Sequence, residues 1–189
     1  MKSWQEKLSS DIEKVLISEK EIALRITELA QEISKFYQTH NIHEITVVGI
    51  LRGSVVFMSD LIRKLDLDVQ IDFMAVSSYD KGTVSSGTVR IIKDLSDAIE
   101  NKHVLIIEDI IDTGITLDSL QQMLLARNPA SLRLCSLLNK PSRRLTEVAV
   151  DFCGFVIEDE FVVGYGLDYS GEYRNIPYIG TLKKKVYKK

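Results

Sequence analysis

The sequence predicts an α/β protein with a mainly parallel, twisted sheet flanked by helices on both faces. Three short runs rich in apolar and β-branched residues, 45–50, 103–107 and 132–138, have the near-continuous apolarity of strands buried on both faces. The first two runs are each followed by a turn and then by a stretch with helical periodicity. Strands that alternate with helices favour a mainly parallel sheet of the doubly wound class.

Length and composition are those of one globular domain spanning residues 1–189. The chain is 45% hydrophobic and 27% charged, which excludes a disordered or fibrous protein. Its formal net charge of -3 provides no basic field for nucleic acid, so we expect no nucleic-acid partner. The terminal lysine cluster, which spans 183–185 and 188–189, is predicted to be a solvated tail.

The sequence also favours a cytoplasmic protein with no membrane partner. The first seven residues lack the apolar segment of a signal peptide, and no apolar run approaches the roughly 18 residues of a membrane span. Cys135 and Cys153 each lie in an apolar stretch, where a thiol usually behaves as a small buried hydrophobe.

The first predicted element is a helix. Ser18 and Glu21 form a capping box, which marks its start. Apolar residues then recur at steps of four and three and predict one buried stripe: Ile22, Ile26, Leu29, Ile33 and Phe36. After the strand at 45–50 we expect a second helix from Ser54 to about Leu65.

A second strand is predicted over Val69–Val76, followed by a long polar loop. Residues 77–88 contain two glycines and too few apolar side chains to bury the segment, and a strand resumes at Val89. After the strand at 103–107 comes a polar turn and an amphipathic helix through Leu124. Short later strands are predicted over 148–152 and 161–165.

In open parallel sheets, ligands bind beyond the carboxyl ends of the strands, and the most informative motif lies there. Residues 104–117 consist of an apolar strand, two adjacent acids, two apolar residues, a third acid and Thr-Gly-x-Thr at the start of a helix. This segment resembles the phosphoribosyl pyrophosphate signature of the type I phosphoribosyltransferases. The free amides of Asp112 to Thr116 would hold a phosphate at the helix N-terminus. Thr113 and Thr116 add hydroxyl donors, Gly114 allows close approach, and Ile115 contributes only its amide.

Glu108 and Asp109 are adjacent, so both cannot point into the core. Two carboxylates beside a phosphate site would repel the ligand, but ribose hydroxyls and a magnesium ion would offset them. The alternatives are an ordinary strand-to-helix turn, or an acidic pocket like that of a phospho-accepting signalling receiver.

Further segments are similar to the hypoxanthine-guanine branch of this family. Leu51, Arg52 and Gly53 resemble its pyrophosphate loop, although the family usually has Lys where this chain has Arg52. The resemblance implies a cis peptide between Leu51 and Arg52; a plain turn is the alternative. Ser78 and Tyr79 resemble the start of a mobile lid over about 77–89, and a disordered surface loop is the alternative reading.

The base-recognition residues implied by the resemblance follow later in the chain. Lys140 would donate to the 6-oxo group of a purine, because an ammonium has donors only. Phe161 would stack on the base, Val162 would read its edge through backbone groups, and Asp168 would supply an acid to a second magnesium ion. Arg174 would bind pyrophosphate through its planar fork.

The resemblance therefore implies a Mg²⁺-dependent enzyme that joins hypoxanthine or guanine to phosphoribosyl pyrophosphate. Asp112 is the expected general base, and Glu108, Asp109 and Asp168 are the expected metal ligands. A small hood built from the N-terminal segment and about 150–189, and a homodimer or homotetramer, are carried over from the family. The alternatives are a transferase for another base, a nucleotide-sensing regulator with the same fold, or a signalling receiver.

Overall fold

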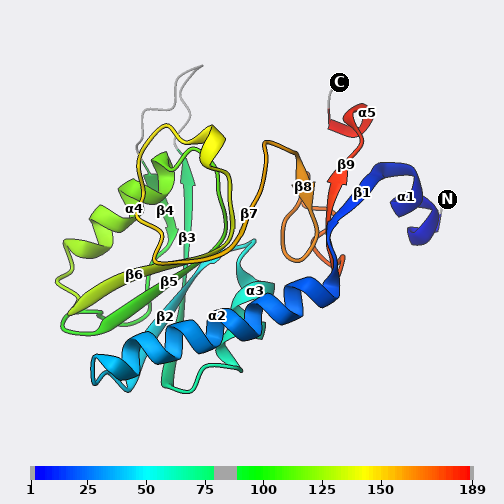
Figure 1. Ribbon diagram of the computed structural model, residues 1–189. Coiled ribbons are helices and arrows are strands. Elements are labelled where there is room, and N and C mark those ends of the chain that lie inside the picture. Colours follow the sequence, from blue (N-terminus) through cyan, green and yellow to red (C-terminus); the bar gives the residue numbers. More distant parts are fainter. Residues whose placement is uncertain (1–2, 79–88, 188–189) are drawn as a thin grey trace.

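A six-stranded sheet with the order β4-β3-β2-β5-β6-β7 forms the main body of the computed structural model, which describes residues 3–78 and 89–187 (Figure 1). All neighbouring strands are parallel except β3 and β4, which are antiparallel. The strands are β2 (Glu44–Leu51), β3 (Asp68–Ser78), β4 (Val89–Lys93), β5 (His103–Ile111), β6 (Ser131–Asn139) and β7 (Phe152–Val156). The predicted fold class is confirmed.

The central strands are mainly apolar because both faces of the sheet are covered. Val47 and Leu105 pair across β2 and β5 and belong to one apolar cluster, whereas Val48 and Ile106 pair in the same way and belong to the cluster on the opposite face. All four side chains are completely buried. Alternate residues therefore serve two cores, which is why these runs are mostly apolar, and Thr46 and Ser136, polar residues within β2 and β6, are themselves buried.

Helices cover the two faces unequally. The cluster on one face contains buried residues of α2 (Glu19–Thr39) and α3 (Val55–Ile62), and the other contains those of α4 (Ile115–Leu125). The predicted capping box at the start of α2 is present: Ser18 Oγ accepts from Glu21 N–H, and the Glu21 carboxylate accepts from Ser18 N–H. In Figure 1, α2 runs along the lower front of the sheet, and α4 lies on the opposite side.

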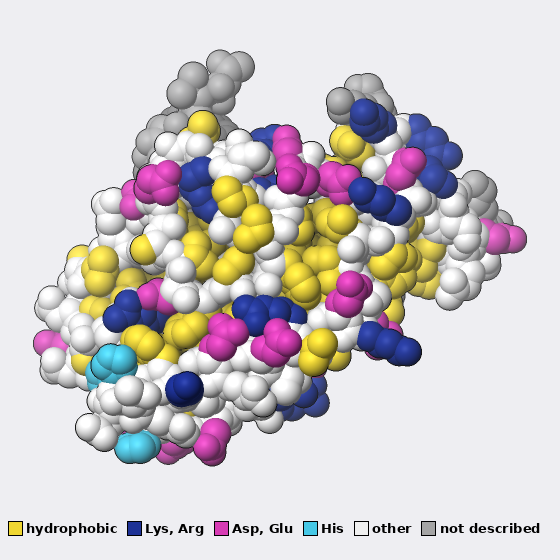
Figure 2. All heavy atoms as spheres, in the orientation of Figure 1, with side chains coloured by type: hydrophobic (Ala, Val, Ile, Leu, Met, Phe, Trp, Pro, Cys, Tyr) yellow, Lys and Arg dark blue, Asp and Glu magenta, His cyan; other side chains and the backbone are white. Residues whose placement is uncertain are grey.

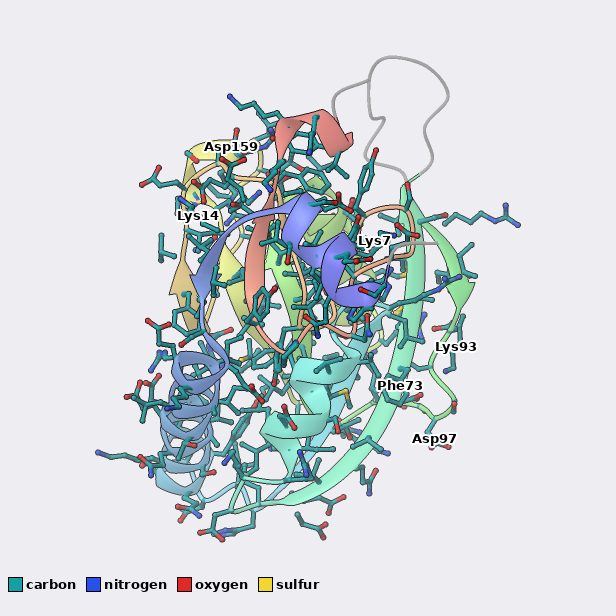
Figure 3. The ribbon with its side chains drawn as sticks, turned by 90° about the vertical axis from the view of Figure 1, so that its right-hand side faces the viewer. Lys7, Lys14, Phe73, Lys93, Asp97 and Asp159 are labelled. Carbon is teal, nitrogen blue, oxygen red and sulfur yellow. The ribbon has the colours of Figure 1, made fainter. Side chains whose placement is uncertain are left out.

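A second, three-stranded antiparallel sheet brings the two ends of the chain together. It has the order β1-β9-β8 and is formed by β1 (Ile12–Ile17), β8 (Val162–Val163) and β9 (Ile179–Leu182). The short helices α1 (Trp4–Asp11) and α5 (Lys184–Tyr187) flank it, and we call these five elements the hood. Lys7 of α1 forms an ion pair with Glu172 at 2.7 Å, and Figure 3 shows Lys7 on α1.

Several element boundaries differ from those predicted from the sequence. The strand predicted over 148–152 is wrong: β7 begins at Phe152, because Val148 and Val150 instead pack as irregular chain against the cluster of α4. The strand predicted over 161–165 is reduced to β8, because Gly164 and Tyr165 adopt positive φ angles of 99° and 50°. The second helix ends at Ile62 rather than near Leu65.

Two strands run further than predicted, and both extensions matter for the site. β5 continues to Ile111, so Glu108 and Asp109 lie within the strand rather than in a turn. β3 continues to Ser78, which pairs with Val89 of β4. Tyr79, the second predicted lid residue, lies outside the described residues.

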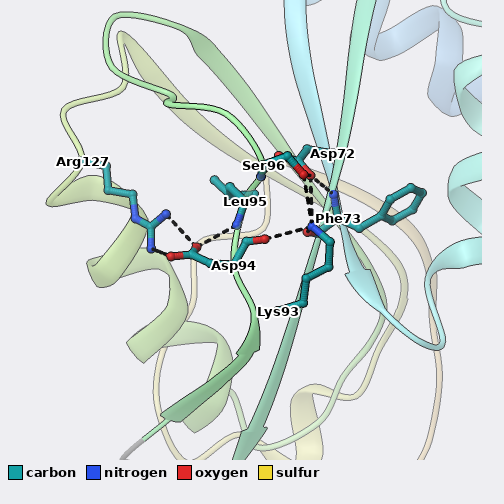
Figure 4. Close-up of polar contacts among 7 residues, drawn as sticks. All are labelled: Asp72, Phe73, Lys93, Asp94, Leu95, Ser96 and Arg127. Carbon is teal, nitrogen blue, oxygen red and sulfur yellow. Dashed lines mark hydrogen bonds and ion pairs between the residues drawn. The ribbon is translucent and has the colours of Figure 1, made fainter.

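The turn that follows β4 is fixed by a cluster of polar contacts (Figure 4). Asp72 of β3 accepts hydrogen bonds from the backbone N–H groups of Phe73 and Ser96, at 2.7 and 2.6 Å. Asp94 forms two hydrogen bonds with Arg127, at 2.8 and 3.0 Å. These contacts tie the antiparallel edge of the sheet to the end of α4.

None of the helices in the described ranges combines the length and apolarity needed to cross a membrane.

Candidate functional site

A cavity of about 660 Å³ opens between the carboxyl ends of β5 and β6 and the hood. Its lining comes from both sheets and from the connections between them: Asp109, Ile110, Asp112, Lys140, Arg143, Asp159, Glu160, Phe161, Val162, Leu167, Asp168, Lys184 and Tyr187. On the face shown in Figure 2, acidic and basic side chains gather along the upper edge, between the sheet and the hood. The cavity is therefore polar and carries charges of both signs.

Six of the residues predicted from the sequence meet in this cavity: Asp109, Asp112, Lys140, Phe161, Val162 and Asp168. They come from positions up to 59 residues apart in the chain, and the parallel register of β5 and β6 brings the first three together. Of the other predicted residues, Gly53 contacts Asp109, and Arg174 contacts Asp168. Thr113, Gly114, Ile115 and Thr116 follow Asp112 directly but do not line the cavity.

Gly53 allows three segments to meet at one point. A Cβ atom on Gly53 would lie 1.5 Å from Oδ2 of Asp109, and a Cβ on Gly166 would lie 2.1 Å from the carbonyl oxygen of Gly53. The loop after β2, the end of β5 and the hood segment after β8 are thus in direct contact. The preceding Leu51–Arg52 peptide is cis, as predicted.

Glu108 and Asp109 occupy an environment that disfavours two negative charges. Burial raises the pKa of Glu108 well above its ordinary value, and the charge of Asp109 raises it further. Burial raises the pKa of Asp109 to about 6, although hydrogen bonds from backbone N–H groups and the nearby Arg174 oppose this shift. Oε2 of Glu108 is buried and has no hydrogen-bond partner among the described residues. Both carboxylates would gain from a hydroxyl donor or a cation.

The turn before α4 is tight and packs closely against the segment around Thr146. Gly114 has a φ of 85°, and a Cβ there would lie 2.4 Å from the carbonyl oxygen of Thr146. The carbonyl oxygen of Thr113 accepts hydrogen bonds from the N–H groups of Leu145 and Thr146, at 2.9 and 3.1 Å. The first N–H groups of a helix lack intrahelical partners, so α4 begins with free donors directly after Asp112.

Arg143 is a member of the site that the sequence analysis missed. Its Nε lies 2.8 Å from Oδ1 of Asp112, and its Nη1 lies 3.5 Å from Oδ2 of Asp159. The guanidinium therefore links the end of β5 to the segment before the hood. The available sequence signal was the pair of arginines shortly after Lys140, of which Arg143 ends the short 3₁₀ helix that begins at Pro141.

Lys140 is almost fully buried, with 7% of its surface exposed. Its Nζ donates to the carbonyl oxygen of Glu160 at 2.6 Å. Burial lowers the pKa of the ammonium, while the negative charges of Asp112 and Asp159 oppose this shift. A buried ammonium between acidic groups is not an ordinary surface lysine.

Asp168 and Arg174 form a pair on the hood side. The Arg174 Nη2 lies 2.6 Å from Oδ1 of Asp168, and its Nη1 donates to the carbonyl oxygen of Gly166 at 2.6 Å. The N–H of Gly171 donates to Oδ2 of Asp168 at 2.7 Å. Both oxygens of Asp168 are thus already engaged.

The prediction that the terminal lysines form a solvated tail is wrong for Lys183 and Lys184. Lys183 Nζ donates to the carbonyl oxygens of Ser9 and Ser10, both at 3.0 Å, and Lys184 lines the cavity together with Tyr187. Lys188 and Lys189 lie outside the described residues. The sequence could not reveal this, because the pairing of β9 with β8 and β1 brings the C-terminal segment beside the site.

Comparisons with known proteins all indicate the same family. The model of the phosphoribosyl transferase domain matches residues 16–170. A hypoxanthine phosphoribosyltransferase of Haemophilus influenzae is 55% identical over 168 residues, which cover 89% of this chain and 94% of that protein. A hypoxanthine-guanine phosphoribosyltransferase of Staphylococcus aureus is 51% identical over 180 residues, 95% of this chain and 99% of that one.

A solved structure agrees with these sequence matches. The crystal structure of a hypoxanthine phosphoribosyltransferase from Staphylococcus aureus superposes with a TM-score of 0.93 and 49% identity, and the match covers 99% of this chain and 100% of that chain. The fold, the strand-end site and these matches define a transferase that uses a phosphoribosyl donor. The chain belongs to the phosphoribosyltransferase family, as a member of its hypoxanthine(-guanine) branch.

Proposed function

We propose that this chain transfers the phosphoribosyl group of phosphoribosyl pyrophosphate to hypoxanthine or guanine and releases pyrophosphate, and that it acts in purine salvage. The observation that carries the proposal is the position of Lys140, which is buried in the same cavity as Phe161 and Asp112. A purine stacked on Phe161 would present its edge to an ammonium and to a carboxylate. The family membership and the relatives' names support the same activity.

Lys140 is our candidate for recognition of the 6-oxo group. Its Nζ is a donor only, so it would donate to a carbonyl oxygen and disfavour the 6-amino group of adenine. In the structure it donates to the carbonyl oxygen of Glu160, which shows that a carbonyl suits this ammonium. Val162, next to Phe161 on the cavity lining, would bind the base through its backbone.

The donor side of the reaction would be held by backbone amides and by Arg174. The amides that follow Asp112 would bind the 5′-phosphate, assisted by the hydroxyls of Thr113 and Thr116. The pyrophosphate would be bound by Leu51, Arg52, Gly53 and Arg174. Gly53 lies beside Asp109 and Arg174 lies beside Asp168, and both acids line the cavity. The carboxylates of Glu108 and Asp109 would accept hydrogen bonds from ribose hydroxyls.

Asp112 is our candidate general base. It lines the cavity close to Lys140, and an N7 proton of the base would be within its reach as N9 attacks the ribose. Arg143 keeps the Asp112 carboxylate in place through the 2.8 Å ion pair. Proton transfer to Asp112 would weaken that pair and release the guanidinium.

Magnesium fits the acidic end of β5. No group of three or more His, Cys, Asp or Glu side chains that could hold a metal occurs among the described residues, but Mg²⁺ is usually held by one or two carboxylates plus substrate oxygens. Glu108, with its unpartnered buried oxygen, and Asp109 are such a pair. Asp168 is our third candidate, and its pair with Arg174 would have to open first. When bound, magnesium would neutralise charge on the pyrophosphate.

The experiment that tests this proposal is a spectrophotometric assay of hypoxanthine, guanine and adenine with phosphoribosyl pyrophosphate, with and without magnesium. We expect activity with the 6-oxopurines, dependence on magnesium, and a Lys140→Ala variant that loses most of the preference for hypoxanthine over adenine. An unaltered hypoxanthine-to-adenine ratio in this variant would contradict the assignment of Lys140.

A second assay tests the general base. Asp112→Asn should preserve the fold and the binding of GMP but lower kcat by roughly 10²–10⁴-fold. Asp118→Asn is the matched control, because Asp118 lies in the first turn of α4 and does not line the cavity. Unchanged turnover in Asp112→Asn would remove Asp112 from this role.

We further propose that the enzyme is cytoplasmic and a homodimer or homotetramer. The outer surface of α3 is our candidate interface, since Val55 there is an apolar side chain that is 42% exposed. Light scattering of the purified protein, and of a Val55→Asp variant, would measure the state and test this interface.

A further inference from the structure

The C-terminal helix α5 lies against the aromatic side of the cavity. The ring of Tyr187 is stacked on the ring of Phe161, with the two centroids 4.7 Å apart and an interplanar angle of 17°. Tyr169 approaches Phe161 edge-on, at 5.6 Å and 87°. Phe161 is 37% exposed, yet two aromatic rings restrict its orientation.

The position of Tyr187 is fixed by contacts along the preceding segment. Leu182 N–H donates to the carbonyl oxygen of Phe161 at 3.1 Å, so β9 ends beside Phe161. Lys183 N–H then donates to the carbonyl oxygen of Asp11 at 2.8 Å, which ties the start of α5 to the end of α1. Val186 and Tyr187 pack against the apolar cluster of the hood, and Figure 1 shows α5 directly after β9. The stack on Phe161 is thus supported by the rest of the hood.

We infer that Tyr187 is a positioning residue for the purine: it holds the ring of Phe161 in the orientation that the base requires. The inference rests on the proposed function, in which Phe161 stacks on the base. A half-exposed ring that is already ordered has less conformational freedom to lose when the ligand binds. Because a purine would contact Phe161 equally before and during the reaction, the effect belongs to binding and should appear in KM rather than kcat.

Steady-state kinetics of the full chain test this inference. Tyr187→Ala should raise the KM for hypoxanthine about 3- to 10-fold, with kcat and the KM for phosphoribosyl pyrophosphate within about twofold of the unmodified enzyme. Tyr187→Phe keeps the stacked ring and should restore the KM. Tyr187→Leu keeps an apolar contact with the hood without the stack, and should resemble Tyr187→Ala.

The matched control is Lys185→Ala, since Lys185 is on the same helix, exposed, and not on the cavity lining. An unchanged KM for hypoxanthine in both Tyr187→Ala and Tyr187→Leu would overturn the inference. A lower KM would also overturn it, because Tyr187 would then occupy the place of the base.

A double-mutant cycle separates this inference from the proposed function. Phe161→Ala should raise the KM for hypoxanthine, and Tyr187→Ala should add nothing in that background, because Tyr187 acts through Phe161. If Phe161→Ala leaves the KM unchanged, the proposed role of Phe161 fails. If Phe161→Ala raises the KM and Tyr187→Ala does not, the proposed function stands and only the role of Tyr187 fails.

Discussion

Gly53 and Asp109 are so close that the smallest side chain at position 53 would displace the carboxylate. Gly53 and Asp109 can be in contact only because Gly53 has no Cβ atom: a Cβ there would lie 1.5 Å from Oδ2 of Asp109. Unlike Gly114, Gly53 is not required for a positive φ angle. Gly53 therefore allows Asp109 to occupy its position in the site. A substitution at Gly53 should affect the activity more than the backbone conformation.

We predict that Gly53→Ala lowers kcat/KM by at least roughly 10²-fold, because a displacement of about 1 Å of a group in the site is sufficient for such a loss. Gly171→Ala is the comparison: its Cβ would meet no atom within 4 Å, but its φ of 84° makes alanine unfavourable. It should therefore cost stability, by about 1 kcal/mol, and leave kcat/KM unchanged. Kinetics and thermal denaturation of both variants check these opposite results; equal kcat/KM in Gly53→Ala and the unmodified enzyme would contradict the first.

Among elements, the turn after β4 provides a test of how a single carboxylate stabilises the sheet edge. Burial alone would raise the pKa of Asp72, but hydrogen bonds from the N–H groups of Phe73 and Ser96, together with Lys93, outweigh it and lower the pKa. A carboxylate whose pKa is lower in the folded state stabilises the protein above its unfolded pKa, which is about 3.9. That contribution is lost as the pH falls through the lower folded pKa.

We predict that Asp72→Asn lowers the free energy of unfolding by about 1.5–3 kcal/mol at pH 7, because an amide can replace only one of the two acceptor oxygens shown in Figure 4. The difference from the unmodified protein should begin to shrink below about pH 4, where the carboxyl of the unfolded chain takes up a proton, and should be lost as the pH falls through the lower folded pKa of Asp72. Urea denaturation at several pH values measures this. Asp97→Asn, at an exposed position of the same turn marked in Figure 3, is the control, and a difference that does not depend on pH would rule out the ionic contribution.

The sequence predicted well those elements that can be recognised without knowledge of their neighbours in the tertiary structure. β2, β5 and β6 are buried on both faces, so their apolar runs are evident in any context, and α2 carries its own capping box. The hood elements α1, β1, β9 and α5 were missed, because β1 mixes exposed charges with apolar residues and β9 has only four residues. Such short strands are stable only when paired, and β1 and β9, which pair with each other, are more than 150 residues apart in the chain.

Within the site, residues that belong to a sequence motif were predicted, whereas residues that reach the site only through the tertiary structure were missed. Asp109, Asp112 and Lys140 lie at strand ends, where a parallel sheet brings ligand-binding groups together, so the resemblance and the topology agreed. Arg143 and Tyr187 reach the cavity through a 3₁₀ turn and through the hood; two adjacent arginines after Lys140 are the only sequence signal for the first, and no sequence pattern marks the second. The roles of all these residues stay predictions until the variants are measured.

At the scale of the whole molecule, the cavity lies between the two sheets, and hood residues such as Ile17 and Ile179 belong to the same buried cluster as residues of the main sheet. The main sheet contributes Asp109, Asp112 and Lys140, whereas the hood and its connections contribute Phe161 and Tyr187. The hood in turn depends on contacts between the chain ends, such as the hydrogen bond of 2.9 Å from the Tyr173 hydroxyl to Asp11. A nucleotide that contacts both sides of the cavity would link the two sheets and stabilise the folded state of both.

We therefore predict that GMP raises the melting temperature of the whole protein in one transition. At a concentration of 100 times Kd, a ligand that binds only the folded state adds about 2.7 kcal/mol, which for a chain of this size corresponds to roughly 5–10 °C. AMP should give a much smaller shift, because its 6-amino group faces Lys140, and Lys140→Ala should reduce the difference between the two nucleotides. Differential scanning calorimetry measures all three. Equal shifts with GMP and AMP in the unmodified protein would contradict the role of Lys140 in distinguishing a 6-oxo group from a 6-amino group.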